Sequence, residues 1–162
     1  MTRALHTNEC LTVIDLGGNS IGPEGAIAVA DALRDNTSLR TLYLGGNYIG
    51  NAGSIAMGLV LKHSTGLALR SLFLDGNGLC PADIGHIAQG VGRNVSLRCL
   101  VLRENQVGRE GSIALLRAVK MNSQLGLNQL EGIRLDRDTL VRSQRRRGDI
   151  ERGYCGANEH AS

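Results

Sequence analysis

The sequence has few aromatic residues, few prolines and no long apolar run. Aromatic side chains make up 2% of the 162 residues, there is no tryptophan, and proline occurs twice. A core made from this composition has to be aliphatic. No apolar run approaches the roughly 20 residues that a membrane-spanning helix needs, so we expect no membrane contact. The opening MTRALHTNECLTV lacks the apolar centre of a secretory signal, which indicates a cytoplasmic protein, with a nuclear one as the alternative.

The residues that usually carry catalysis or bind metals show no recognisable spacing. The four cysteines form no C-x-x-C pair, and the four histidines lack metal-ligand spacing. We therefore expect reduced thiols, no metal and no cofactor. Neither a G-x-S-x-G turn nor an H-E-x-x-H helix is present. The sequence predicts a protein that is not an enzyme.

Glycine, by contrast, is abundant, and its arrangement first suggests a nucleotide site. The stretch LYLGGNYIGNAGSIA, residues 42–56, runs from strand-like spacing through a glycine-rich loop into a predicted helical segment. A phosphate-binding loop also needs a Lys followed by Ser or Thr, and a dinucleotide site needs G-x-G-x-x-G spacing. Both are missing here, which disfavours nucleotide binding.

The same stretch recurs along the chain. Copies begin at Leu11, Leu39, Leu69 and Leu97, at spacings of 28, 30 and 28 residues, and a degenerate fifth copy, LEGIRLDRDTL, begins at Leu130. The glycines therefore belong to a repeated unit. In this unit Gly22, Gly50 and Gly108 are expected to shape a turn, and Pro23 and Pro81 fit the helix start that follows.

Each unit reads L-x-x-L-x-L-x-x-N-x-[ILV], followed by a small-residue turn and a helical segment, and this pattern resembles the leucine-rich repeat family. The longer period and the N-x-I-G-x-x-G turn resemble the ribonuclease-inhibitor type, also found in Ran GTPase-activating proteins and NOD-like receptors. The resemblance covers roughly residues 4–138. It implies an α/β solenoid of about four and a half repeats, with short parallel strands on the concave side and helices on the convex side.

Apolar residues that share a repeat position should stack into the interior of the solenoid. In the strands these columns are Ile14, Leu42, Leu72 and Leu100, and Leu16, Leu44, Leu74 and Leu102. In the helices they are Val29, Met57, Ile87 and Leu115, and Leu33, Leu61, Val91 and Val119. Small residues beside them, Ala30, Gly58 and Ala88, are expected to let the helix and strand layers approach closely.

One polar column follows the strands: Asn19, Asn47, Asn77 and Asn105. The turn that leaves each strand has backbone N–H and C=O groups without ladder partners, and a buried amide can satisfy both kinds. The family resemblance implies such an asparagine ladder. The alternative, amides that bind a ligand, is less economical because the ladder explains all four copies together.

The concave strand face is the expected binding surface, because solenoids of stacked repeats bind partners there. Its outward columns are Asp15, Tyr43, Phe73, Val101 and Arg134, and then Gly17, Gly45, Asp75, Arg103 and Asp136. Two of the four aromatic residues in the chain are neighbours in this surface, although they could also merely cover the strand backbone. We predict a protein-binding site made of Tyr43, Phe73, Asp75, Val101, Arg103, Glu104 and Arg134.

The repeat domain is predicted to span residues 1–140 and to start within a repeat, because ALHTNECL at residues 4–11 matches ALRDNTSL at residues 32–39. Without an N-terminal cap an apolar flank would meet water. A truncated product, a piece of a larger assembly, or a chain that self-associates through this repeat would each account for it. Residues 141–162 form an Arg-rich, basic tail that we expect to be disordered. The repeats are nearly neutral, so nucleic acid is not an expected partner.

These features predict a non-enzymatic protein-interaction module, a scaffold whose concave face binds a partner protein of unknown identity. Two alternatives follow from the family resemblance. One is GTPase activation of the Ran type, although that family has an acidic tail where this chain is basic. The other is a sensor fragment of a NOD-like receptor.

Overall fold

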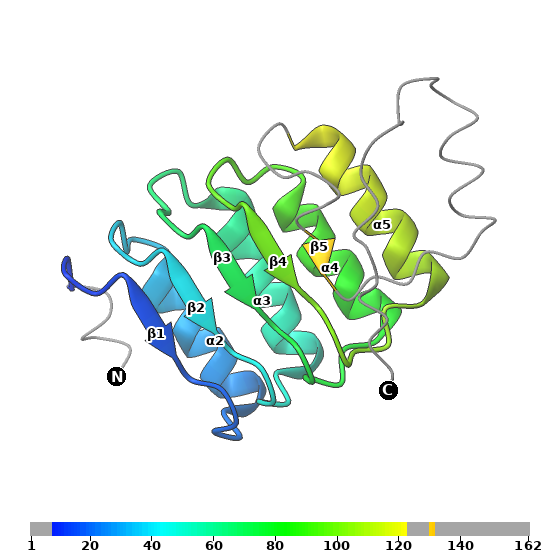
Figure 1. The fold of residues 1–162 in the computed structure, drawn as a ribbon, viewed down its shortest axis with the longest axis horizontal. Coiled ribbons are helices and arrows are strands. Elements are labelled where there is room, and N and C mark those ends of the chain that lie inside the picture. Colours follow the sequence, from blue (N-terminus) through cyan, green and yellow to red (C-terminus); the bar gives the residue numbers. More distant parts are fainter. Residues whose placement is uncertain (1–7, 123–129, 132–162) are drawn as a thin grey trace, which may run out of the picture.

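The computed structural model describes residues 8–122 and 130–131, in which short strands alternate with helices (Figure 1). The strands are β1 (Val13–Asp15), β2 (Thr41–Tyr43), β3 (Ser71–Phe73), β4 (Cys99–Val101) and β5 (Leu130–Glu131). The helices are α2 (Gly22–Leu33), α3 (Gly50–His63), α4 (Pro81–Val91) and α5 (Gly108–Met121). None of the described helices is long and apolar enough to cross a membrane.

The strands form one parallel sheet in chain order, β1-β2-β3-β4-β5. They pair in register at one repeat position, so Leu42 lies opposite Leu72, which lies opposite Leu100. Figure 1 shows the strands as one layer and the helices as a second layer behind it. The α/β leucine-rich-repeat solenoid predicted from the sequence is confirmed.

The interior is aliphatic, as the repeat columns predict. Leu42, Leu72 and Leu100 are fully buried, and so are Met57, Ile87 and Leu115 in the helices. In the first repeat Ile14 and Leu16 are only half-buried, because β1 has a neighbouring strand on one side alone among the described residues. Full burial in this fold therefore needs a neighbouring repeat on both sides of a unit.

The register of β5 differs from the sequence alignment. The alignment places Gly132 beside Cys99 and Arg134 beside Val101, but Leu130 pairs with Leu100 and Glu131 pairs with Val101. This register keeps a separation of 30 residues between paired leucines, as between Leu42 and Leu72. The length of the turn and helix that connect two strands sets this separation. It outweighs the alignment of Leu130 with the first leucine of the other repeats. Arg134 itself, Asp136 and the predicted tail lie outside the described residues.

Helix α4 begins differently from its neighbours. Helices α2, α3 and α5 start at Gly22, Gly50 and Gly108, whose φ angles are 68°, 58° and 60°, in the left-handed region that favours glycine. At α4 the equivalent residue is Cys80, which has an extended backbone and caps the helix. Its backbone N–H donates to Asp83 Oδ2 at 2.9 Å, and this capping box replaces the glycine turn.

Asp83 also connects α4 to α3. Its Oδ1 accepts hydrogen bonds from Asn51 Nδ2 at 2.8 Å and from Ser54 Oγ at 3.4 Å. Burial by itself would raise the pKa of this carboxyl group, but the hydrogen bonds from the Cys80 backbone, Asn51, the Cys80 side chain and Ser54 together outweigh it and lower the pKa. The ionised carboxylate therefore stabilises the contact between the two helices.

Glycines let α3 and α4 touch backbone to backbone. A Cβ atom built on Gly58 would collide with the carbonyl oxygen of His86, and one built on Gly90 would collide with the carbonyl oxygen of Gly58. The sequence predicted that Gly58 serves the approach of the helix and strand layers. That assignment was wrong, because the close neighbour of Gly58 is the next helix.

Gly58 and Gly85 make a matched test of this contact. We expect Gly58→Ala to lower the free energy of unfolding by about 1–3 kcal/mol, because the added methyl group overpacks the helix interface. Gly85 in α4 has no atom within 4 Å of a built Cβ, so Gly85→Ala should raise stability by about 1 kcal/mol through helix propensity. Urea unfolding followed by circular dichroism measures both; equal effects would contradict the backbone contact.

The Asp83 network predicts a pH dependence of stability. The pKa is lower in the folded chain than in the unfolded chain, where it is near 3.9. Its contribution is therefore present above pH 4 and is lost as the pH falls through the folded pKa. Asp83→Asn should lower the unfolding free energy at pH 7 and flatten its decline between about pH 5 and pH 3. Exposed Asp31→Asn is the matched control, and an unchanged profile for Asp83→Asn would refute the assignment.

Candidate functional site

The outward side chains of the strands meet in columns because the strands are in register. Asp15, Tyr43, Phe73 and Val101 are neighbours in one column. The rings of Tyr43 and Phe73 stack with a centroid distance of 4.3 Å and an interplanar angle of 20°. Both are half-buried, whereas Val101 is only 5% exposed. The stacked rings thus present the apolar surface of this face, and Val101 adds little to it.

The acidic side chains of the predicted site lie at the ends of the strands. The Asp75 carboxylate lies over Gly45, since a Cβ built on Gly45 would be 2.6 Å from Asp75 Oδ2. The Glu104 carboxylate lies near Gly76, 3.6 Å from a Cβ built there. Each carboxylate therefore leans over a glycine of the preceding repeat. The next strand-end residue, Arg103, is exposed.

Glu104 has a strained backbone. Its φ angle is 57°, in the left-handed region, and the same repeat position is Gly18, Gly46 and Gly76 in the other repeats, with φ angles of 67°, 66° and 59°. A non-glycine residue in this conformation costs on the order of 1–3 kcal/mol. Strain of this kind is often retained where a side chain has a function, and Glu104 is exposed on the predicted binding face.

Directly beneath this face the asparagine column connects each repeat to the one before it. Asn77 Oδ1 accepts from the backbone N–H groups of Asn47 at 3.0 Å and Ile49 at 3.4 Å. Asn77 Nδ2 donates to the carbonyl oxygens of Leu44 and Leu74, both at 2.9 Å. Asn47 and Asn105 repeat this arrangement, while Asn19 is exposed and donates to Gly17 within its own turn. These amides hold the turns that carry Asp75 and Glu104.

The repeat pattern also matches a known family. The chain matches the family model described as leucine-rich repeat over residues 7–30, 35–58 and 93–116. This chain is a leucine-rich repeat protein. The unmatched copy lies between residues 58 and 93, where the repeat spacing lengthens from 28 to 30 residues.

Solved structures of leucine-rich repeat domains share the fold. One is described as leiomodin-1 actin-binding site 2, with a TM-score of 0.74 and 19% identity over 90% of this chain and 86% of that one. Another is the tropomodulin C-terminal domain of Caenorhabditis elegans, with a TM-score of 0.74 and 13% identity over 89% and 87%. At these identities the likeness concerns the fold alone. No curated protein sequence matches the chain significantly.

Sequence reasoning missed a row of arginines on this leucine-rich repeat protein. Arg40, Arg70 and Arg98 are exposed and directly precede β2, β3 and β4. The backbone N–H groups of Arg70 and Ser71 both donate to the Arg40 carbonyl oxygen, at 2.7 and 2.9 Å, and the next repeat makes the same bonds to Arg70. The signal was present in the sequence, because an arginine follows the first leucine in each of these three repeats.

A second asparagine column, at the other end of the repeats, was also missed. Its members Asn36, Asn94 and Asn122 are buried and donate to carbonyl oxygens of the preceding repeat, for example Asn94 Nδ2 to Leu61 at 2.9 Å. At the equivalent place, directly after α3, the chain has Ser64, whose buried Oγ has no hydrogen-bond partner among the described residues. A serine is too short to replace the amide here.

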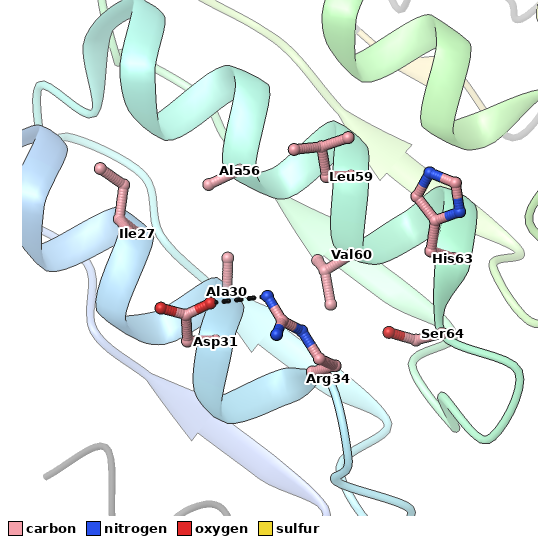
Figure 2. Close-up of a pocket in the computed structure, with 9 residues that line it drawn as sticks. All are labelled: Ile27, Ala30, Asp31, Arg34, Ala56, Leu59, Val60, His63 and Ser64. Atoms are coloured by element: carbon pink, nitrogen blue, oxygen red, sulfur yellow. Dashed lines mark hydrogen bonds and ion pairs between the residues drawn. The ribbon is translucent and has the colours of Figure 1, made fainter.

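Next to Ser64 the convex surface has a pocket between α2 and α3, with a volume of about 430 Å³ (Figure 2). Its lining is mainly apolar, and the polar residues Asp31, Arg34, His63 and Ser64 complete it. Asp31 and Arg34 form an ion pair at 2.9 Å. Val60 and Ala30 occupy the repeat positions of Gly90 and Gly58, so side chains rather than backbones meet between these helices.

The described residues give no metal site, and β1 is an edge strand of the sheet. No group of three His, Cys, Asp or Glu side chains within them could hold a metal ion, and Cys10, Cys80 and Cys99 are not joined in a disulfide with one another. Strand β1 pairs with β2 alone among the described strands; Val13 within β1 is 54% exposed, and Leu11 just before it is 48% exposed. Self-association through this repeat stays a prediction.

The Glu104→Gly variant distinguishes the stability cost of the strained backbone from the contribution of the side chain to binding. We expect the glycine variant to be more stable by about 1 kcal/mol, because the left-handed conformation suits glycine. If the carboxylate contacts a partner, the same variant should bind that partner more weakly. Urea unfolding and a binding titration measure the two effects. Exposed Glu110→Gly in α5 is the control, and it should lose stability.

Proposed function

We propose that this protein is a non-enzymatic protein-interaction module that binds a partner protein on its concave strand face. The observation that carries the proposal is the Tyr43–Phe73 stack at the centre of that face. Both rings are half-exposed, although aromatic residues are only 2% of the chain. Buried aromatic anchors with charged neighbours supply much of the binding energy in protein interfaces.

The surroundings of the stack support this proposal. The rings are pre-stacked by in-register strands, so little side-chain entropy remains to be lost on binding. Asp75 and Glu104 lie beside them at the strand ends and supply polar contacts at the rim. Among the predicted contacts, Arg134 lies outside the described residues and Val101 is buried, so the proposed surface consists of Tyr43, Phe73, Asp75, Arg103 and Glu104.

Actin is a reasonable first purified partner to test, because the leiomodin-1 structure is described as an actin-binding site. An identity of 19% shows a shared fold, so the proposal names a protein partner and uses actin as the first one to test. Neither of the two structures compared above is a GTPase-activating protein or a NOD-like receptor. Those two alternatives rest on the repeat type alone.

Affinity capture tests the concave face. The wild-type chain, a Tyr43→Ser/Phe73→Ser variant and an Ile27→Ser/Leu59→Ser variant are each immobilised and incubated with cell lysate and, separately, with purified actin. Partners are identified by mass spectrometry. We expect at least one protein to be captured by the wild type and by the Ile27/Leu59 variant, and to be reduced at least tenfold with the Tyr43/Phe73 variant.

The Ile27/Leu59 variant is the matched control, because it removes two exposed apolar side chains from the convex pocket instead. All three chains must show similar thermal unfolding. Capture that survives in the Tyr43/Phe73 variant but not in the control would assign binding to the convex pocket and overturn the proposal. Capture that is equal in all three would overturn it as well.

A further inference from the structure

Charge is segregated across the concave face. Arg40, Arg70 and Arg98 lie at the starts of three adjacent strands, and all three are exposed. The Tyr43–Phe73 stack lies in the middle of the strands. Asp75, Arg103 and Glu104 lie beyond the strand ends. The last group has two carboxylates against one guanidinium, so the face has a basic row, an apolar strip and a net acidic row, in that order along the strand direction.

The two charged rows are far enough apart for a helix to lie between them. Asp75 lies five positions after Arg70, an extended distance of at most about 17 Å. An α-helix with its side chains is about 10–12 Å in diameter. A helix lying across the strands can thus place an apolar stripe on the aromatic rings while its two flanks reach the two charged rows.

We propose that the segment bound by this face is an amphipathic α-helix with one acidic flank, which faces Arg40, Arg70 and Arg98, and one basic flank, which faces Asp75 and Glu104. This inference rests on the proposed function, because it describes the partner of the same concave face. It specifies the chemistry of the partner: a helix with an apolar stripe between flanks of opposite charge. A helix laid in a groove by its apolar stripe is a common mode of peptide recognition.

The spacing of the arginines favours a helix over an extended peptide. Adjacent strands are about 4.8 Å apart, so the first and third arginine positions are roughly 9.6 Å apart. Acidic residues at i, i+4 and i+7 of a helix span about 10.5 Å, because each residue rises 1.5 Å. Alternate residues of an extended peptide, at i, i+2 and i+4, span about 13 Å. The helix therefore matches the row more closely.

The two carboxylates beyond the strand ends argue against nucleic acid as the occupant. A phosphate backbone that neutralised the arginines would also lie near Asp75 and Glu104, on the same face, and like charges brought together cost free energy. A helix with flanks of opposite charge satisfies both rows. It also contributes the apolar contact that the stacked rings require.

Two designed helical peptides of 18 residues test the inference. Both carry Leu at heptad positions a and d. The polarised peptide has Glu at b and e and Lys at c and g, so each flank carries one sign of charge. The mixed peptide has the same composition with Glu at b and c and Lys at e and g. We expect the wild-type chain to bind the polarised peptide at least about tenfold more tightly, measured by fluorescence anisotropy at low salt.

Charge reversal on the protein supplies the second part of the test. Arg40→Glu/Arg70→Glu should abolish the preference for the polarised peptide and should bind a peptide with Lys at b, c, e and g more tightly than the wild type does. Arg93→Glu/Arg117→Glu changes the net charge equally at exposed positions on the helical side, and it should keep the wild-type preference. Matching thermal unfolding curves show that both variants are folded.

Several outcomes would overturn the inference. They are equal affinity of the wild type for the two designed peptides, no measurable binding of either, or the same response from both charge-reversal variants. If any of these occurs while lysate capture still depends on Tyr43 and Phe73, the concave face binds a partner of another shape and the proposed function stands. If capture is also independent of those rings, both proposals fail.

Discussion

The hydrogen bonds of the asparagine amides are the interaction on which the rest of the molecule depends. Each strand has only three residues or fewer, so it makes few ladder bonds, and the turn after it would leave backbone groups unpaired. The Asn77 amide pairs groups from two repeats at once, two N–H groups of the preceding repeat and carbonyl oxygens on both sides. A buried unpaired group would cost about 1–3 kcal/mol, so the turns can adopt only the register in which these bonds form.

On the convex side the same regular strand layer carries unequal helix contacts. Helices α3 and α4 meet through Gly58 and Gly90 with their backbones in contact, and Asp83 adds hydrogen bonds across the pair. Between α2 and α3 bulkier residues occupy those positions, a pocket opens, and Ser64 interrupts the second asparagine column. The backbone path of each repeat is therefore similar, while the packing between helices varies with single residues.

The concave face combines this regular backbone with irregular side chains. Register brings residues of different repeats within one strand spacing of each other, so a row of like charges or a ring stack needs only one suitable residue in each repeat. The strained conformation of Glu104 shows that a polar side chain occurs there at a cost in stability, where three other repeats have glycine. A binding surface can thus change by substitution without any change in the fold.

The period of the leucines and asparagines determined the fold class, the parallel register of β1 to β4 and the inward columns, because a repeated pattern is read directly from the chain. Residues on the concave face were also predictable as a set, since strand residues alternate between two faces. The arginine row was also visible in the sequence, as an arginine after the first leucine of three repeats, although it was not predicted as part of the face.

The tertiary structure alone decided which of these residues are available and what they touch. Val101 is buried, the carboxylates of Asp75 and Glu104 lean over glycines of the preceding repeat, and Gly58 contacts a helix rather than the strands. The register of β5 also departs from the alignment of leucines. Each of these features depends on distances between repeats that are about 30 residues apart in the chain. A periodic sequence specifies the order of its repeats but not the packing distance between neighbouring backbones.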